Sequence, residues 1–226
     1  SIYKGKRVKI LNPVFINTEK GPVIIDDEVK IEPFVYIKGP VYIGKKSLIK
    51  ANSSIYGPVS FQYYCKIGGE VSSSIFLSFS NKQHYGFIGD SYVGSFVNLG
   101  AGTTTSNLKN NYSVVKVRIG RKEIETGKIF IGSFIGDYVR TGIGTNLNTG
   151  TVIGIGSQII GRKGEKYIPP FIFEKGKYFE YEIEKEFATI KVMKKRRGVE
   201  FWDEERRILL KIFKETKDER KNFIKE

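Results

Sequence analysis

The sequence predicts an all-β protein, a left-handed parallel β-helix of hexapeptide repeats with about six coils, followed by a C-terminal α-helical tail. The first observation is that aliphatic residues recur every six positions, a period that fits neither an α-helix nor an ordinary strand. The second is that a small or β-branched residue follows each of them four positions later. The third is a change of composition beyond residue 165, where glycine becomes rare and helical spacing appears.

Each repeat is expected to form one short strand and one turn, so that three repeats close a triangular coil. The leading aliphatic residue points into the prism, and the small residue fills the same layer near a corner, because two large residues would overpack it. Stacked coils then bury one apolar column. The predicted leading residues form three blocks: Ile25, Ile31, Ile37, Ile43, Ile49, Ile55, Phe61 and Ile67; Phe87, Val93 and Leu99; and Ile129, Ile135, Thr141, Leu147, Ile153 and Ile159.

Two interruptions divide the repeats. We assign residues 8–165 to the β-helix, with inserts at 72–86 and 104–128, and residues 166–226 to a mostly helical extension. The second insert contains the alternating stretch from Val115 to Ile119, which turns at Gly120 and predicts a protruding hairpin. Loops that leave a rigid solenoid are the expected place for function.

Composition limits the class of protein. The net charge is +14, spread along the chain rather than gathered with aromatic residues, which disfavours nucleic-acid binding and favours attraction of small anions. No membrane span and no signal peptide are visible, so we expect a soluble cytoplasmic protein. The single cysteine, Cys65, occupies a small-residue core position. Because the chain begins at Ser1 without Met, we expect it to be part of a longer or processed chain.

His84 is the only histidine and lies in the first insert, just before the repeat resumes. A neutral imidazole is a suitable base near pH 7. One histidine cannot supply the three imidazoles that zinc enzymes on such scaffolds need, so no metal site is expected.

The segment from His84 to Asn107 resembles the signature of glucosamine-1-phosphate N-acetyltransferases. Those are the C-terminal β-helix domains of bifunctional N-acetylglucosamine-1-phosphate uridylyltransferase/acetyltransferases, hexapeptide-repeat transferases. The resemblance is to a divergent branch, carried by Ser80–Phe87, Ser106–Tyr112 and Asn148–Val152.

The resemblance implies roles for individual residues. His84 falls on the general base that takes a proton from the substrate amine. Asn98 and Asn107 fall on residues that line the sugar and acetyl pockets. Phe87 stands where most members have a sugar-contacting tyrosine, and Leu108 likewise replaces a tyrosine, which leaves the sugar specificity open.

The phosphate and coenzyme sites are assigned less directly. The cations that hold the sugar phosphate in the common branch have no clean match, and the candidates are Lys82 and Lys50, then Lys116. Backbone N–H groups of the turn at Gly100–Gly102 could serve as oxyanion donors, with the Ala101 N–H meeting the thioester. The implied acetyl-CoA contacts are Ala101, Gly102, Thr149, Gly150 and Thr151.

The resemblance implies a homotrimer that transfers acetyl groups from acetyl-CoA to glucosamine-1-phosphate in UDP-N-acetylglucosamine biosynthesis. An N-terminal nucleotidyltransferase domain is expected in the parent chain. Two alternatives stay open: an acyltransferase that uses another amino sugar or an acyl carrier protein, and a non-catalytic oligomerisation or regulatory β-helix of a sugar-nucleotide pyrophosphorylase.

Overall fold

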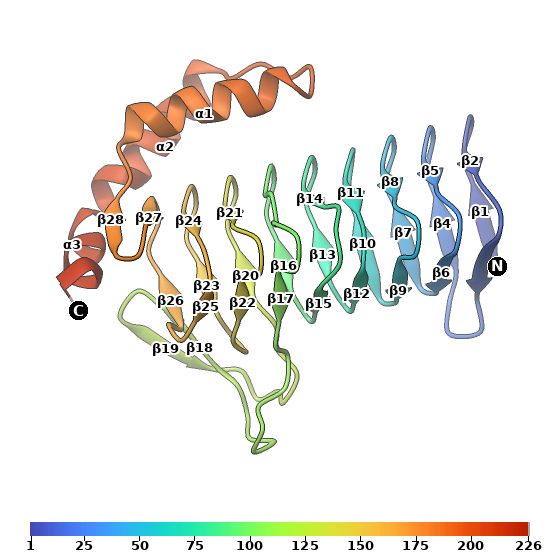
Figure 1. Ribbon diagram of the computed structural model, residues 1–226, viewed down its shortest axis with the longest axis horizontal. Coiled ribbons are helices and arrows are strands. Elements are labelled where there is room, and N and C mark those ends of the chain that lie inside the picture. Colours follow the sequence, from blue (N-terminus) through green and yellow to red (C-terminus); the bar gives the residue numbers. More distant parts are fainter. Residues whose placement is uncertain (226) are drawn as a thin grey trace.

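The computed structural model describes residues 1–225, apart from the side chains of residues 162 and 163, and shows a three-sided prism of stacked parallel strands (Figure 1). One face, here face A, is a sheet of nine parallel strands, so the prism has nine coils rather than the predicted six. The repeat count missed the first coil and the coils that contain shortened or lengthened repeats. The strands of face A are β1 (Ile2–Lys4), β4 (Val23–Ile25), β7 (Val41–Ile43), β10 (Val59–Phe61), β13 (Ile75–Phe76), β16 (Tyr92–Val93), β20 (Phe134–Ile135), β23 (Val152–Ile153) and β26 (Tyr167–Ile168).

Face B consists of two sheets. Asn98 joins them through two single β-bridges, one with Asn81 of the first sheet and one with Arg140 of the second. Its strands are β2 (Lys9–Ile10), β5 (Lys30–Ile31), β8 (Leu48–Ile49), β11 (Lys66–Ile67), β14 (Asn81–Lys82), β21 (Arg140–Thr141), β24 (Gln158–Ile159), β27 (Ile172–Glu174) and the antiparallel β28 (Tyr178–Glu180).

Face C completes the prism. Its strands are β3 (Val14–Asn17), β6 (Val35–Lys38), β9 (Ser54–Tyr56), β12 (Glu70–Ser72), β15 (Phe87–Gly89), β17 (Thr104–Thr105), β22 (Asn146–Leu147) and β25 (Arg162–Lys163).

The predicted apolar column exists. From Ile25 to Ile67 every leading residue is fully buried, and neighbouring coils pair these residues directly, as Ile31 with Ile49. Full burial of one such side chain stabilises the fold by roughly 1.5–3 kcal/mol. Two predicted leading residues are wrong: Ile88, not Phe87, points inward, and Ile129 is 40% exposed.

Residues 72–86 are not an insert that leaves the prism. They contain β13 and β14, which pair in register with the strands of the coils on both sides. The six-residue spacing fails here because buried residues follow each other at shorter steps, from Ile67 to Val71 and then Phe76. The second interruption does leave the prism and holds the predicted hairpin, formed by β18 (Lys116–Ile119) and β19 (Lys122–Glu125).

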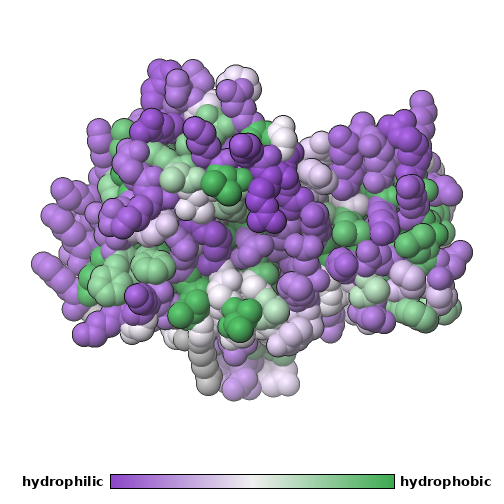
Figure 2. Space-filling model, turned by 45° about the horizontal axis from the view of Figure 1, so that its top comes forward, coloured by the Kyte–Doolittle hydropathy of each residue, from purple (hydrophilic) through white to green (hydrophobic). Residues whose placement is uncertain are grey.

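The tail forms three helices, α1 (Ile183–Lys195), α2 (Asp203–Glu215) and α3 (Lys217–Lys225). The first two lie along one edge of the prism over its C-terminal half, and α3 covers its C-terminal end (Figure 1). At that end Phe223 packs on the apolar column and its ring lies 4.8 Å from that of Tyr178. The face of the molecule seen in Figure 2 is mainly hydrophilic with scattered apolar patches. No helix of the described residues is both long and apolar enough to cross a membrane.

Candidate functional site

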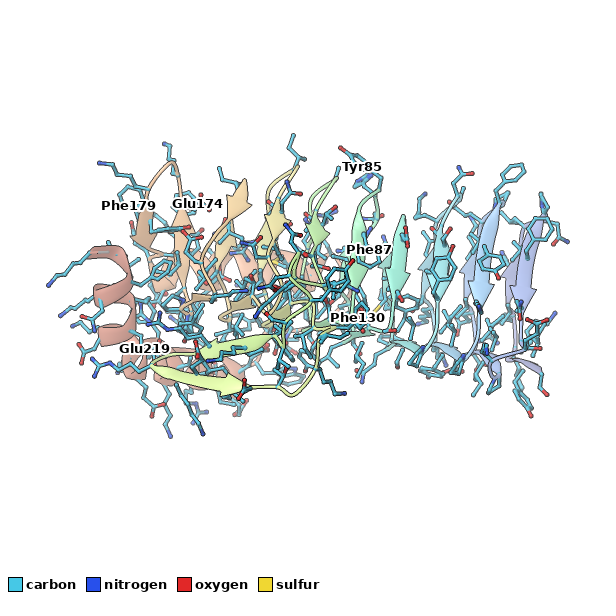
Figure 3. The ribbon with its side chains drawn as sticks, turned by 90° about the horizontal axis from the view of Figure 1, so that it is seen from below. Tyr85, Phe87, Phe130, Glu174, Phe179 and Glu219 are labelled. Carbon is cyan, nitrogen blue, oxygen red and sulfur yellow. The ribbon has the colours of Figure 1, made fainter. Side chains whose placement is uncertain are left out.

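The loop that carries His84 turns the corner between faces B and C, and both His84 and Tyr85 are exposed there. Figure 3 shows Tyr85 projecting away from the prism. The turn depends on Gly86, which has φ of 117° and passes so close to the next coil that a Cβ would come within 2.2 Å of the Thr103 carbonyl oxygen. Only glycine fits this place without a shift, so the tight turn fixes how His84 is presented.

Lys82 lies two residues before His84 and occupies a leading position inside the prism. Its side chain is 2% exposed, and its partner across the ladder is Ile67. The ammonium group donates hydrogen bonds to the carbonyls of Gly68, at 2.7 Å, and His84, at 2.9 Å. Burial lowers the pKa of Lys82 to about 8. The lysine therefore holds the His84 loop from inside, which differs from the phosphate contact that the sequence predicted.

Ala101 and Gly102 lie on the next coil at the same corner. The Gly102 N–H donates to the Tyr85 carbonyl at 3.0 Å, and the Ala101 carbonyl accepts a hydrogen bond from the Gly144 N–H at 2.7 Å. Among the described residues, nothing accepts a hydrogen bond from the Ala101 N–H. The corner thus places a free backbone donor on the coil that adjoins His84.

Phe87 and Asn107 meet on face C. A Cβ on Gly89 would lie 2.3 Å from the Phe87 ring and 3.1 Å from the Asn107 amide nitrogen, so both side chains cover this glycine. The Asn107 amide donates to an Asp90 carboxylate oxygen at 2.6 Å.

Asn98 lies on face B, exposed, between Asn81 and Arg140. The structure therefore does not bring Asn98 and Asn107 together within one chain, because they belong to different faces of the prism.

The other predicted contacts lie elsewhere. Lys50 pairs with Glu32 at 3.0 Å, and Lys116 pairs with Glu123 at 2.9 Å on the exposed hairpin. Thr149, Gly150 and Thr151 are buried, and a Cβ on Gly150 would lie 2.8 Å from Val115 at the base of the hairpin. These residues remain predicted ligands that the single chain does not gather around His84.

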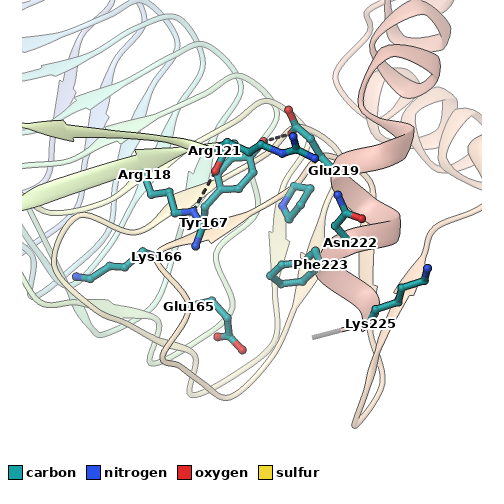
Figure 4. Close-up of a pocket in the computed structure, with 11 residues that line it drawn as sticks. Arg118, Arg121, Glu165, Lys166, Tyr167, Glu219, Asn222, Phe223 and Lys225 are labelled. Atoms are coloured by element: carbon teal, nitrogen blue, oxygen red, sulfur yellow. Dashed lines mark hydrogen bonds between the residues drawn. The ribbon is translucent and has the colours of Figure 1, made fainter.

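Two pockets take part of their lining from the helices of the C-terminal tail or the residues next to them. The larger, of about 460 Å³, lies between the hairpin, the last coil and α3, and its cations share the lining with Glu165 and Glu219 (Figure 4). The smaller, of about 280 Å³, lies between α1 and face B and contains Asn98. Sequence reasoning missed the second pocket because a third of its lining comes from the tail, which is distant in sequence from the prism residues that form the rest.

No model of a protein family matches the chain. Among curated proteins, it is 40% identical over 142 residues to a bifunctional sugar-1-phosphate nucleotidylyltransferase/acetyltransferase of Sulfurisphaera tokodaii, a match that covers 62% of this chain and 35% of that protein. It is 29% identical over 164 residues to the bifunctional protein GlmU of Wigglesworthia glossinidia brevipalpis, covering 70% of this chain and 32% of that protein.

The predicted resemblance is confirmed. The homologues of this chain are sugar-1-phosphate nucleotidylyltransferase/acetyltransferases and GlmU proteins. The chain spans about a third of the length of the first of them.

The solved structure of an Arabidopsis UDP-N-acetylglucosamine acyltransferase has the same fold. It superposes with a TM-score of 0.52 over 83% of this chain and 73% of the other, at 10% identity. The predicted fold class, a left-handed parallel β-helix of the hexapeptide-repeat type, is confirmed. As predicted, the relatives and this neighbour are enzymes that transfer acyl groups.

Proposed function

We propose that the chain transfers the acetyl group of acetyl-CoA to the amine of an amino-sugar phosphate, with glucosamine-1-phosphate as the first candidate. The observation that carries this proposal is the corner where His84 is exposed on one coil and the unpartnered Ala101 N–H lies on the adjoining coil. Support comes from the 40% identical relative, which is named for sugar-1-phosphate and acetyl transfer. In this proposal the protein acts in the cytoplasm, in UDP-N-acetylglucosamine biosynthesis, as part of a chain with a nucleotidyltransferase domain.

The chemistry needs a base and an oxyanion donor. The His84 imidazole takes a proton from the substrate amine as the amine adds to the thioester, and the imidazolium can then return that proton to the leaving thiolate. The Ala101 N–H donates to the oxygen that becomes negative when the amine adds to the thioester carbonyl. Collapse of the adduct breaks the C–S bond, forms the amide and releases CoA thiolate, which takes up a proton. No step requires a metal ion.

The assembly is a homotrimer in this proposal. The separation of Asn98 on face B from Asn107 on face C supports sites between subunits, because one prism alone cannot bring both amides to one substrate. Light scattering of the eluting protein would give the mass of three chains. A monomer that retains full turnover would contradict the shared site.

The test of activity is release of CoA from acetyl-CoA in the presence of glucosamine-1-phosphate, for the wild type, His84→Asn and the exposed control Gln62→Ala. Loss of a general base predicts a fall of about a hundredfold or more in kcat for His84→Asn, with the control unchanged. Wild-type turnover that survives in His84→Asn would rule out His84 as the base. A wild type inactive with every amino-sugar phosphate, and with an acyl carrier protein as donor, would favour the regulatory β-helix.

A further inference from the structure

The pocket between α1 and face B collects positive charge from two parts of the chain that are distant in sequence. Its cationic lining residues are Lys66 and Arg140 from the prism and Arg196 and Arg197 from the segment that follows α1. No aspartate or glutamate is among its described lining residues. The pocket is therefore an electropositive cavity that forms only when the tail packs on the prism.

Two of the four cations, Arg197 and Arg140, are held in place by contacts with neighbouring side chains. Arg197 donates to the Asn81 side chain, and its guanidinium lies 4.9 Å from the centre of the Tyr64 ring. Arg140 is held by the fully buried Glu186 on α1. These contacts fix two walls of the cavity.

The remaining positive charge is uncompensated. Among the described residues, Lys66, Arg196 and Arg197 have no carboxylate partner within 4 Å. Burial and the neighbouring charges of Arg196 and Arg197 lower the pKa of Lys66. Like charges that crowd in a half-buried cavity favour an anion that binds among them.

We infer that this pocket binds a phosphate monoester, with Lys66, Arg196 and Arg197 as its ligands. Guanidinium groups suit such an anion because their paired N–H donors match phosphate oxygens. A volume of about 280 Å³ exceeds that of a lone phosphate, being roughly nine waters at ~30 Å³ each. The bound group thus includes part of the molecule that carries the phosphate.

The place of the pocket relates it to the proposed reaction, and the identity of its ligand rests on that proposed function. Its lining includes Asn98 and Gln83, and Gln83 directly precedes His84 in the chain. The phosphate belongs either to the amino sugar or to the 3′-phosphate of CoA. In both cases the tail adds Arg196 and Arg197 to the cations of the prism.

The test is calorimetric binding to the intact protein, which needs no turnover. The probes are inorganic phosphate, glucosamine-1-phosphate, glucosamine, CoA and dephospho-CoA. The variants are Arg196→Gln on the tail and Lys66→Gln on the prism, with Lys195→Gln as the matched control. Lys195 is exposed and adjacent to Arg196 but does not line the pocket, so its replacement removes the same charge near the end of α1.

Loss of one charge-assisted hydrogen bond predicts about tenfold weaker binding of one phosphate monoester in both test variants, and less than twofold change in the control. If the site holds the sugar phosphate, the test variants bind glucosamine-1-phosphate more weakly, and the wild type itself binds glucosamine only weakly. A CoA site shows the weaker binding for CoA and not for dephospho-CoA. If all variants bound glucosamine-1-phosphate and CoA as tightly as the wild type does, the assignment would be overturned. It would also be overturned if the control Lys195→Gln lost as much affinity for inorganic phosphate as the two test variants. Specific binding by a protein without transferase activity would refute the proposed function and leave the phosphate site standing.

Discussion

The same corner of the prism, between faces A and B, is built differently in its two halves. The first three coils place Arg7, Glu28 and Lys46 at the left-handed corner position, with φ of 55–60°. Except for one coil that has Gly156, later coils place aromatic residues there, with φ of 55–68°: Tyr64, Phe79, Phe96, Tyr138 and Phe171. Backbone hydrogen bonds between successive corners run along this edge from Glu28 to Phe171, so the positions are equivalent.

The chemical difference between the two sets of corner residues depends on whether the C-terminal helices cover them. Phe79, Phe96, Tyr138 and Phe171 belong to a cluster with Phe187, Ile190 and Leu209 of the tail. The charged corners lie beyond the reach of the helices (Figure 1). Phe96 stacks on Phe79 with ring centres 4.5 Å apart. The comparison teaches that one backbone position takes its chemistry from what covers it, because apolar rings gain free energy only where another apolar surface excludes water.

The largest expected effect comes from uncovering the aromatic half. Deletion of residues 198–226 removes α2 and α3 and exposes both the aromatic corner and the C-terminal end of the apolar column. Loss of several buried apolar side chains, at roughly 2–4 °C per kcal/mol, predicts a fall in Tm of at least ~10 °C. Scanning calorimetry measures it, and an unchanged Tm would show that the tail does not stabilise the prism.

Phe96→Ala sharpens the comparison at a single corner. Phe96 is 7% exposed between two stacked rings, so its removal leaves a cavity that costs roughly 3–5 kcal/mol of unfolding free energy. Lys46→Ala, at the equivalent position of an uncovered coil, is the matched control and should unfold at nearly the wild-type urea concentration. Equal losses in both variants would contradict the dependence on the helical cover.

Lys82→Met compares two equivalent positions inside the prism, Lys82 and its ladder partner Ile67. Because burial lowers the folded-state pKa of Lys82 from 10.5 to about 8, the unfolded chain binds more protons between these pH values. Stability is therefore lost as the pH falls through this window, by ~3 kcal/mol at most.

Lys82→Met should lack this pH dependence of stability. Urea unfolding at pH 7 and pH 10 measures it, with Lys9→Met at an exposed position as the control. The kcat of Lys82→Met should also fall, because the His84 carbonyl loses its donor. The same slope in the wild type and Lys82→Met would show that Lys82 does not titrate in this window.

The smallest effect is expected at the charged corner. Glu28→Gln removes the 2.9 Å ion pair with Arg7, in which the Arg7 side chain is 68% exposed. Solvent screening makes such pairs weak, so the Tm should stay within experimental error. A clear loss of Tm would mean that the uncovered corner depends on its charges.

Much of the fold could be predicted from the period alone. From Ile25 to Ile67 each leading residue is buried as expected, because every six-residue repeat of one strand and one turn points the side chain at its leading position into the prism. The prediction failed where steps shorten, at Val71 and Phe76, and where a lysine takes an interior position. The sequence suggested a phosphate contact for Lys82, because its interior position depends on two carbonyl groups that only the folded loop provides.

The sequence by itself determined the parallel β-helix, the protruding hairpin, the helical tail and the resemblance that points to His84. These follow from local spacing and from motifs that are contiguous in the chain. The tertiary structure decided the number of coils, the interior place of Lys82, the separation of Asn98 from Asn107 and the cationic pocket beneath α1. Those features join residues such as Lys66 and Arg197, which are distant in sequence, and only the packing of the tail on the prism brings them together.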